Sequence, residues 1–134
     1  MKRPGQDTAE SGLWGERVAE RFLMQKGLKV LSRRVTVGKH DEIDLVARDG
    51  EALVFIEVKT RRVEDFGRPV SAVDGRKQHA LSRAAVGYMR KLKRMPCFFR
   101  FDVVEVVGCP NDDAPEIRHI ENAFTLDRRY TLVY

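Results

Sequence analysis

Two carboxylates and a lysine lie beside short apolar runs in the first half of the chain. Asp44 interrupts the run 43–46, and Glu57 and Lys59 come directly after the run 53–56. The second run is continuously apolar, which is typical of a strand buried on both faces. Because an unpaired charge beside a buried strand is costly, these carboxylates need a positive partner. A metal ion and a lysine are the two candidates.

Asp49-Gly50 separates the two runs and predicts a β-hairpin, since a type I′ turn requires positive φ at both of its central residues. With these two residues as the whole loop, Asp44 pairs with Phe55. Side chains alternate between faces with a period of two, so one face carries four charged side chains: Glu42, Asp44, Glu57 and Lys59. In this register Asp44 and Glu57 are diagonal neighbours, with Cβ atoms roughly 7–8 Å apart. Two carboxylates at that separation predict a site for one divalent ion.

Length and composition predict a soluble globular protein. The chain has 134 residues, of which 43% are hydrophobic and 34% charged, and we expect a single domain over residues 1–134. No apolar run approaches the roughly 20 residues of a membrane span, and the basic N-terminus lacks the apolar core of a signal peptide. A cytoplasmic location with no membrane partner is the default expectation.

The net charge of +5 favours a polyanionic partner. Cys97 and Cys109 lack the spacing of metal ligands. We expect two free thiols, with a bridge between them as the open alternative.

Apolar periodicity and turn residues divide the chain into two helices and five strands. We expect a disordered lead over residues 1–7, followed by a helix from Thr8 or Ser11 to Lys26, a strand over 28–37, the two hairpin strands, a loop over 63–69, a helix from Ser71 or Asp74 to Lys93, a strand over 97–107 and a short strand over 117–120. This αβββαββ order predicts an α/β fold, in which helices pack against a mixed sheet with an antiparallel hairpin at its centre. The helix between the third and fourth strands makes those two strands parallel.

An Asp on one strand followed by Glu-x-Lys on the next resembles the signature of the PD-(D/E)xK nuclease superfamily. The wider set of residues resembles the YraN-like family of uncharacterised bacterial proteins, which is grouped with nucleases of the Holliday-junction resolvase type. The match covers nearly the whole chain and consists of Gly15-Glu16, Glu42–Ala47, Phe55–Arg61, Phe66-Gly67, Lys77, Arg100–Asp102 and Asn122–Phe124. Asp41 departs from the pattern, because the family usually has glycine before Glu-Ile-Asp.

The resemblance implies a restriction-endonuclease-like fold and a metal-dependent endonuclease that hydrolyses phosphodiester bonds. Asp44 and Glu57 would bind Mg²⁺ or Mn²⁺, with the backbone carbonyl of Val58 as an additional ligand. Lys59 would stabilise negative charge on the phosphate and position the attacking water. Glu16 would face the metal site from the first helix and orient water or hold a second ion, whereas helical periodicity alone favours a solvated residue. The resemblance also implies nucleic acid as the partner, DNA rather than RNA, with branched DNA and a homodimer as open alternatives.

Basic residues flank the predicted centre. Arg61 and Arg62 follow the third strand, and Arg76 and Lys77 begin the second helix, where they can meet a phosphate backbone. An ordinary basic surface is the alternative for each of them. Asp102 is expected to pair with an arginine rather than to act in catalysis.

A non-catalytic nucleic-acid-binding module with the same fold is the main rival to the nuclease interpretation. In that module the acidic residues form an ion-pair cluster with Lys59 and nearby arginines. A protein-interaction domain without a nucleic-acid role is the third alternative, and it leaves the buried charges unexplained.

Overall fold

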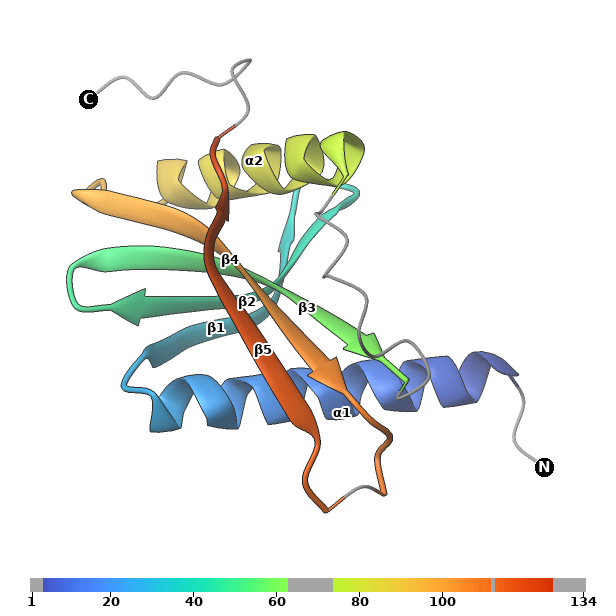
Figure 1. Ribbon diagram of the computed structural model, residues 1–134. Coiled ribbons are helices and arrows are strands. Elements are labelled where there is room, and N and C mark those ends of the chain that lie inside the picture. Colours follow the sequence, from blue (N-terminus) through green and yellow to red (C-terminus); the bar gives the residue numbers. More distant parts are fainter. Residues whose placement is uncertain (1–3, 63–73, 112, 127–134) are drawn as a thin grey trace.

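The computed structural model describes residues 4–62, 74–111 and 113–126, with side chains from residue 12 onward. Within these residues the chain has an α/β fold of two helices and five strands (Figure 1). The elements are, in chain order, α1 (Pro4–Gln25), β1 (Lys29–Val37), β2 (Asp41–Asp49), β3 (Ala52–Arg61), α2 (Gly75–Arg90), β4 (Phe98–Val107) and β5 (Glu116–Phe124). The predicted αβββαββ order and fold class are confirmed.

The five described strands form one mixed sheet in the order β1-β2-β3-β4-β5. β2 pairs antiparallel with both β1 and β3, and β5 pairs antiparallel with β4. β3 and β4 are parallel, as predicted, because the connection between them contains α2. The expected loop over 63–69, with Phe66-Gly67, lies outside the described residues.

The two helices cover opposite faces of the sheet (Figure 1). β3 alternates between the two apolar clusters that result. Leu53 and Phe55 belong to the cluster under α2, and Val54 and Ile56 belong to the cluster under α1. β3 is therefore buried on both faces, as its continuous apolar run predicts. Neither described helix is long and apolar enough to cross a membrane.

α1 begins at Pro4. The expectation of disorder is therefore wrong for residues 4–7, and the helix starts before the predicted Thr8 or Ser11. Proline is well tolerated in the first helical turn, because the N–H that it lacks would have no partner there. Residues 1–3 lie outside the described chain.

α2 and β5 also differ from their expected lengths. α2 begins directly after Asp74, whose side chain caps the helix by accepting a hydrogen bond from Lys77 N. The helix ends at Arg90, three residues before the predicted Lys93. β5 continues to Phe124, because its far end also pairs with β4.

The hairpin turn lies one residue later than predicted. The loop consists of Gly50 and Glu51. Gly50 has a φ of 59°, whereas Glu51 does not have a positive φ, which is the pattern of a type II′ turn. This turn avoids the left-handed conformation that a type I′ turn would demand of Asp49. Both strands shift by one residue, so Asp44 does not pair with Phe55.

Gly15 brings α1 close to the end of β3. A Cβ atom at Gly15 would overlap Thr60 Oγ1, so only glycine allows this helix to lie so near the strand. The close approach places the next residue of the helix, Glu16, over the part of the sheet that carries the predicted centre.

Candidate functional site

β2 and β3 separate at the level of Asp44. Their paired register ends at Leu45 and Ile56. Beyond this point, the Val58 N–H donates a 2.8 Å hydrogen bond to Asp44 Oδ2. A backbone donor at the end of a ladder needs another acceptor, and the carboxylate supplies one. This hydrogen bond holds the Asp44 side chain against β3, next to Glu57.

At this level the side chains of β1 and β2 switch from one face of the sheet to the other. Ile43 packs in the cluster under α2 and Leu45 in the cluster under α1, so the alternation of side chains breaks at Asp44. In the β1–β2 register Arg34 lies opposite Asp44, and its φ is 46°. The prediction that all four charged side chains share one face is therefore wrong. Counted from Ile43, Glu42 lies on the α1 face, whereas Glu57 and Lys59, counted from Phe55, lie on the α2 face. Asp44 lies at the break, and its hydrogen bond from Val58 N holds it next to Glu57.

Asp44 and Glu57 form a partly buried acidic pair. Burial and, next, the charge of Glu57 raise the pKa of Asp44 to about 7, against the hydrogen bond from Val58. Burial also raises the pKa of Glu57, against the attraction of nearby lysines. Glu57 Oε2 is buried and has no hydrogen-bond partner among the described residues. One carboxylate oxygen of the pair therefore lacks a hydrogen-bond donor among the described residues.

Two lysines approach Glu57 from different elements. Lys77 Nζ, on the first turn of α2, lies 3.5 Å from Glu57 Oε1. Lys59 follows on β3 itself, and its charge also lowers the pKa of Glu57. Lys77, predicted as a nucleic-acid contact, therefore lies at ion-pair distance from Glu57, and Lys59 lies near enough for its charge to act on Glu57.

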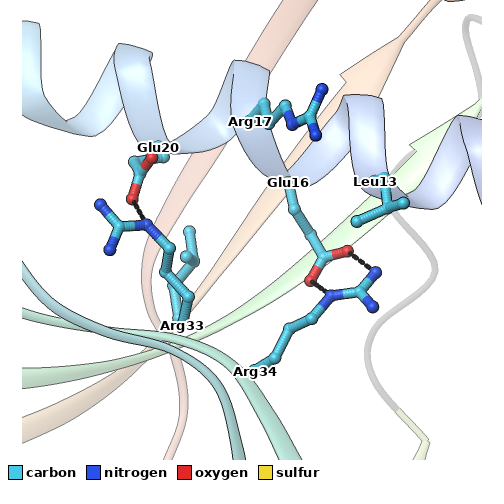
Figure 2. A pocket seen from close by; sticks show the side chains of 7 residues that line it. Leu13, Glu16, Arg17, Glu20, Arg33 and Arg34 are labelled. Atoms are coloured by element: carbon cyan, nitrogen blue, oxygen red, sulfur yellow. Dashed lines mark hydrogen bonds and ion pairs between the residues drawn. The ribbon is translucent and has the colours of Figure 1, made fainter.

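Glu16 lies near the pair but is bound to an arginine. Arg34 donates to both Glu16 oxygens, from Nε at 3.2 Å and from Nη2 at 2.8 Å (Figure 2). The charge of Glu16 still contributes to the raised pKa of Asp44. The ion pair lines a pocket of about 140 Å³ between α1 and the sheet. The other lining residues are Leu13, Arg17, Glu20, Arg33 and Leu45.

The chemistry of the donors fits a magnesium-type ion. No group of three or more His, Cys, Asp or Glu side chains able to hold a metal occurs in the described part of the chain. Mg²⁺ is commonly held by only one or two carboxylates and keeps several waters. The orphaned Glu57 Oε2 beside Asp44 suits such an ion. The carbonyl of Val58 remains a predicted ligand.

The predicted nucleic-acid contacts divide into two groups. Arg62, Arg76 and Lys77 are exposed. Arg61 is mostly buried instead, with its Nε 3.5 Å from Glu105 Oε1. Glu105 lies in β4 with no exposed surface, and sequence analysis did not single it out, although a lone acid within the apolar run 103–107 is a signal of a buried ion pair.

A second buried carboxylate, Asp102, lies on β4 as well. Arg100 Nε donates to its Oδ1 at 3.0 Å, which confirms the predicted arginine pair. His119 Nε2 lies 2.8 Å from Oδ2, and Asn122 N donates to Oδ1 at 2.9 Å. Sequence analysis missed His119, since 17 residues separate it from Asp102. Both cysteines are exposed free thiols, as expected.

A mixed sheet flanked by two helices, with an Asp and a Glu-x-Lys where its second and third strands separate, defines a restriction-endonuclease-like core. Residues 15–106 match the sequence model of uncharacterised protein family UPF0102. The chain belongs to this family.

Several relatives match most of the chain. A UPF0102 protein of Syntrophomonas wolfei is 42% identical over 86% of this chain and 97% of its own length. One of Symbiobacterium thermophilum is 46% identical over 82% of this chain and 92% of its own. One of Geotalea daltonii is 41% identical over 90% of this chain and 93% of its own. The predicted resemblance to the family is confirmed.

Proposed function

We propose that the protein is a metal-dependent endonuclease that hydrolyses phosphodiester bonds in nucleic acid, DNA rather than RNA. The observation that carries the proposal is the partly buried pair of Asp44 and Glu57, in which both pKa values are raised and Glu57 Oε2 has no hydrogen-bond partner among the described residues. A pair of this kind costs folding free energy unless a cation neutralises it. A pair of carboxylates with perturbed pKa values favours a function that uses it.

Asp44 and Glu57 would hold one Mg²⁺ or Mn²⁺, with the Val58 carbonyl as a further ligand. When bound, such an ion supplies Lewis acidity and lowers the pKa of a coordinated water. The hydrogen bond from Val58 N holds Asp44 Oδ2 against β3, and the other oxygen of the carboxylate takes no part in this bond. The backbone thus orients the carboxylate before any ion arrives.

Lys59 would stabilise negative charge on the phosphate. It lies two residues beyond Glu57 on β3, and a cation placed there meets charge that develops during hydrolysis. Lys77 would neutralise Glu57 when no metal is bound, as its 3.5 Å separation allows. The exposed residues Arg62 and Arg76 would contact the nucleic-acid backbone nearby.

One observation favours the rival function, a nucleic-acid-binding module without catalysis. The ion pair between Lys77 and Glu57 shows that an internal cation already partly neutralises the acidic pair. In this alternative the lysines and carboxylates serve only to stabilise the fold. The two functions differ in whether a divalent ion binds.

Cleavage assays separate the two functions. Wild-type protein, Asp44→Asn and Lys59→Ala are incubated with linear, flapped and four-way DNA in Mn²⁺. Lys93→Ala, an exposed lysine beyond the end of α2, is the matched control. Cleavage by wild type and Lys93→Ala alone supports the nuclease. Binding of DNA with no cleavage of any substrate favours the rival, and equal cleavage by all four proteins points to a contaminant and contradicts the assigned site.

Calorimetry gives an independent measurement of the metal. Wild type is expected to bind Mn²⁺ with release of protons near pH 7, because Asp44 must be ionised to act as a ligand. Asp44→Asn is expected to lose this binding. Equal Mn²⁺ binding by the two proteins would remove Asp44 from the proposed centre.

A further inference from the structure

Arg34 enters the candidate centre from β1 in a conformation that arginine rarely adopts. Its φ of 46° lies in the left-handed region, which favours glycine and asparagine. The change of face in β1 explains this conformation but not the choice of an arginine. An exposed ion pair does not explain it either, because about half of the Arg34 side chain is exposed whereas its partner, Glu16, is mostly buried. Unfavourable backbone conformations of this kind concentrate at functional sites.

The guanidinium of Arg34 lies among three acidic side chains. Its two hydrogen bonds to Glu16 come first among the causes that raise the pKa of Arg34, and the charges of Glu42 and Asp44 add to them. Because a guanidinium remains charged at every physiological pH, Arg34 is a permanent cation at this position.

Glu16 connects this cation to the proposed metal centre. Its side chain is only 16% exposed, and it reaches the centre from α1, whereas Asp44 and Glu57 come from β2 and β3. Its charge acts on Asp44. Three carboxylates from three different elements therefore lie close enough for their charges to act on Asp44 or on Arg34. A set of carboxylates of this kind can supply ligands to more than one divalent ion.

We propose that Arg34 takes the place of a second metal ion, so that the centre binds one divalent ion on Asp44 and Glu57 while Glu16 is reserved for the guanidinium. The inference rests on the proposed metal centre and adds the number of ions to it. Glu16, the third carboxylate, already has Arg34 as its partner, through hydrogen bonds to both of its oxygens.

A count of bound Mn²⁺ tests the proposal without any measurement of activity. The full-length protein is titrated with Mn²⁺, and the free ion is measured by electron paramagnetic resonance. We expect one bound ion in wild type and two in Arg34→Asn. Arg34→Lys keeps a cation and is expected to bind one. The double variant Glu16→Gln/Arg34→Asn is expected to return to one.

Arg33→Asn is the matched control. Arg33 is the neighbouring residue of β1 and pairs with Glu20 of α1 in the same pocket (Figure 2). This variant removes an arginine of the same kind and is expected to bind one ion. Asparagine tolerates a positive φ, so Arg34→Asn is expected to fold, and a cooperative thermal transition verifies this.

Two results would overturn the proposal: an unchanged ion count in folded Arg34→Asn, or a second ion that persists when Glu16 is also replaced. A second ion in Arg33→Asn would equally overturn it, because the effect would not belong to Arg34. The proposed nuclease can fail separately. If wild type binds no ion and Arg34→Asn binds one through Glu16, Arg34 does exclude a metal ion, but the centre on Asp44 and Glu57 is refuted.

Discussion

Replacement of Asp44 by asparagine is expected to stabilise the metal-free protein at neutral pH. Asparagine removes the charge but keeps an oxygen that can accept the hydrogen bond from Val58 N. The wild-type carboxyl has its pKa raised from 3.8 to about 7, mainly by burial and by Glu57. At about 1.4 kcal/mol for each pH unit, this rise corresponds to on the order of 4 kcal/mol at pH 8. That is a large fraction of the 5–15 kcal/mol typical of folded domains.

The sign of the pH dependence follows from proton binding. Between about pH 4 and pH 7, folded wild type binds more protons at Asp44 than the unfolded chain does. The free energy of unfolding therefore decreases as the pH rises through this window. Asp44→Asn lacks this dependence, so the two proteins should be similar in stability near pH 4 and differ most at pH 8.

Urea denaturation at pH 4, 6 and 8 in the presence of a chelator measures this difference. Addition of Mg²⁺ at pH 8 should stabilise wild type alone, by about 2.7 kcal/mol at a concentration one hundred times the dissociation constant. If the two proteins show parallel pH profiles, or if Asp44→Asn is the less stable at pH 8, the carboxyl does not carry the burial cost argued here.

Asp41→Asn is a control in which removal of the charge is expected to destabilise the protein rather than to stabilise it. Two hydrogen bonds from Arg83, at 2.6 and 2.7 Å, lower the pKa of Asp41. The ion pair therefore stabilises the fold above the unfolded-state pKa, and this contribution is lost as the pH falls through the lower folded-state value. Asp41→Asn should reduce stability at pH 8, and the reduction should shrink in acid.

Three further substitutions test the packing around the centre, each by urea denaturation. Gly15→Ala should destabilise the protein by roughly 1–3 kcal/mol, because its Cβ overlaps Thr60, and Thr60→Ala should recover part of that loss; a neutral Gly15→Ala would show that α1 can move away freely. Gly50→Ala should cost about 1–2 kcal/mol, because the turn holds φ at 59°, and a stabilising effect would contradict the type II′ assignment. Asp102→Asn should cost roughly 3–5 kcal/mol, because it removes the charge that the mostly buried Arg100 contacts, and a loss below 1 kcal/mol would show that water replaces the carboxylate.

Sequence patterns were sufficient for the order of elements and for the neighbourhood of the site. The apolar run 53–56 is buried on both faces, as predicted, and the helix between β3 and β4 accompanies a parallel pair. The meeting of Asp44 and Glu57 also followed from adjacent strands of one hairpin. Such features depend on residues close in the chain, where periodicity and turn chemistry act directly.

The exact turn was beyond the sequence pattern, because either residue next to Gly50 can complete a two-residue loop. The choice of Gly50 and Glu51 depends on how both strands pack in the sheet. Because each strand shifts by one residue, the same side chains of β2 and β3 still share a face. Phe55, however, pairs with Val46 rather than with Asp44. A sequence-based register that is wrong by one residue on each strand therefore still placed the acids near each other.

The amino-acid sequence by itself determined an α/β fold with two acids and a lysine at the ends of neighbouring strands, since these depend on local periodicity. Only the tertiary structure decided what each charge contacts. Arg34 binds Glu16 across 18 residues, and Asp102 meets His119 across 17. These contacts join α1 to β1 and β4 to β5, and their partners are selected by the packing of whole elements, a long-range effect that no pattern along the chain records.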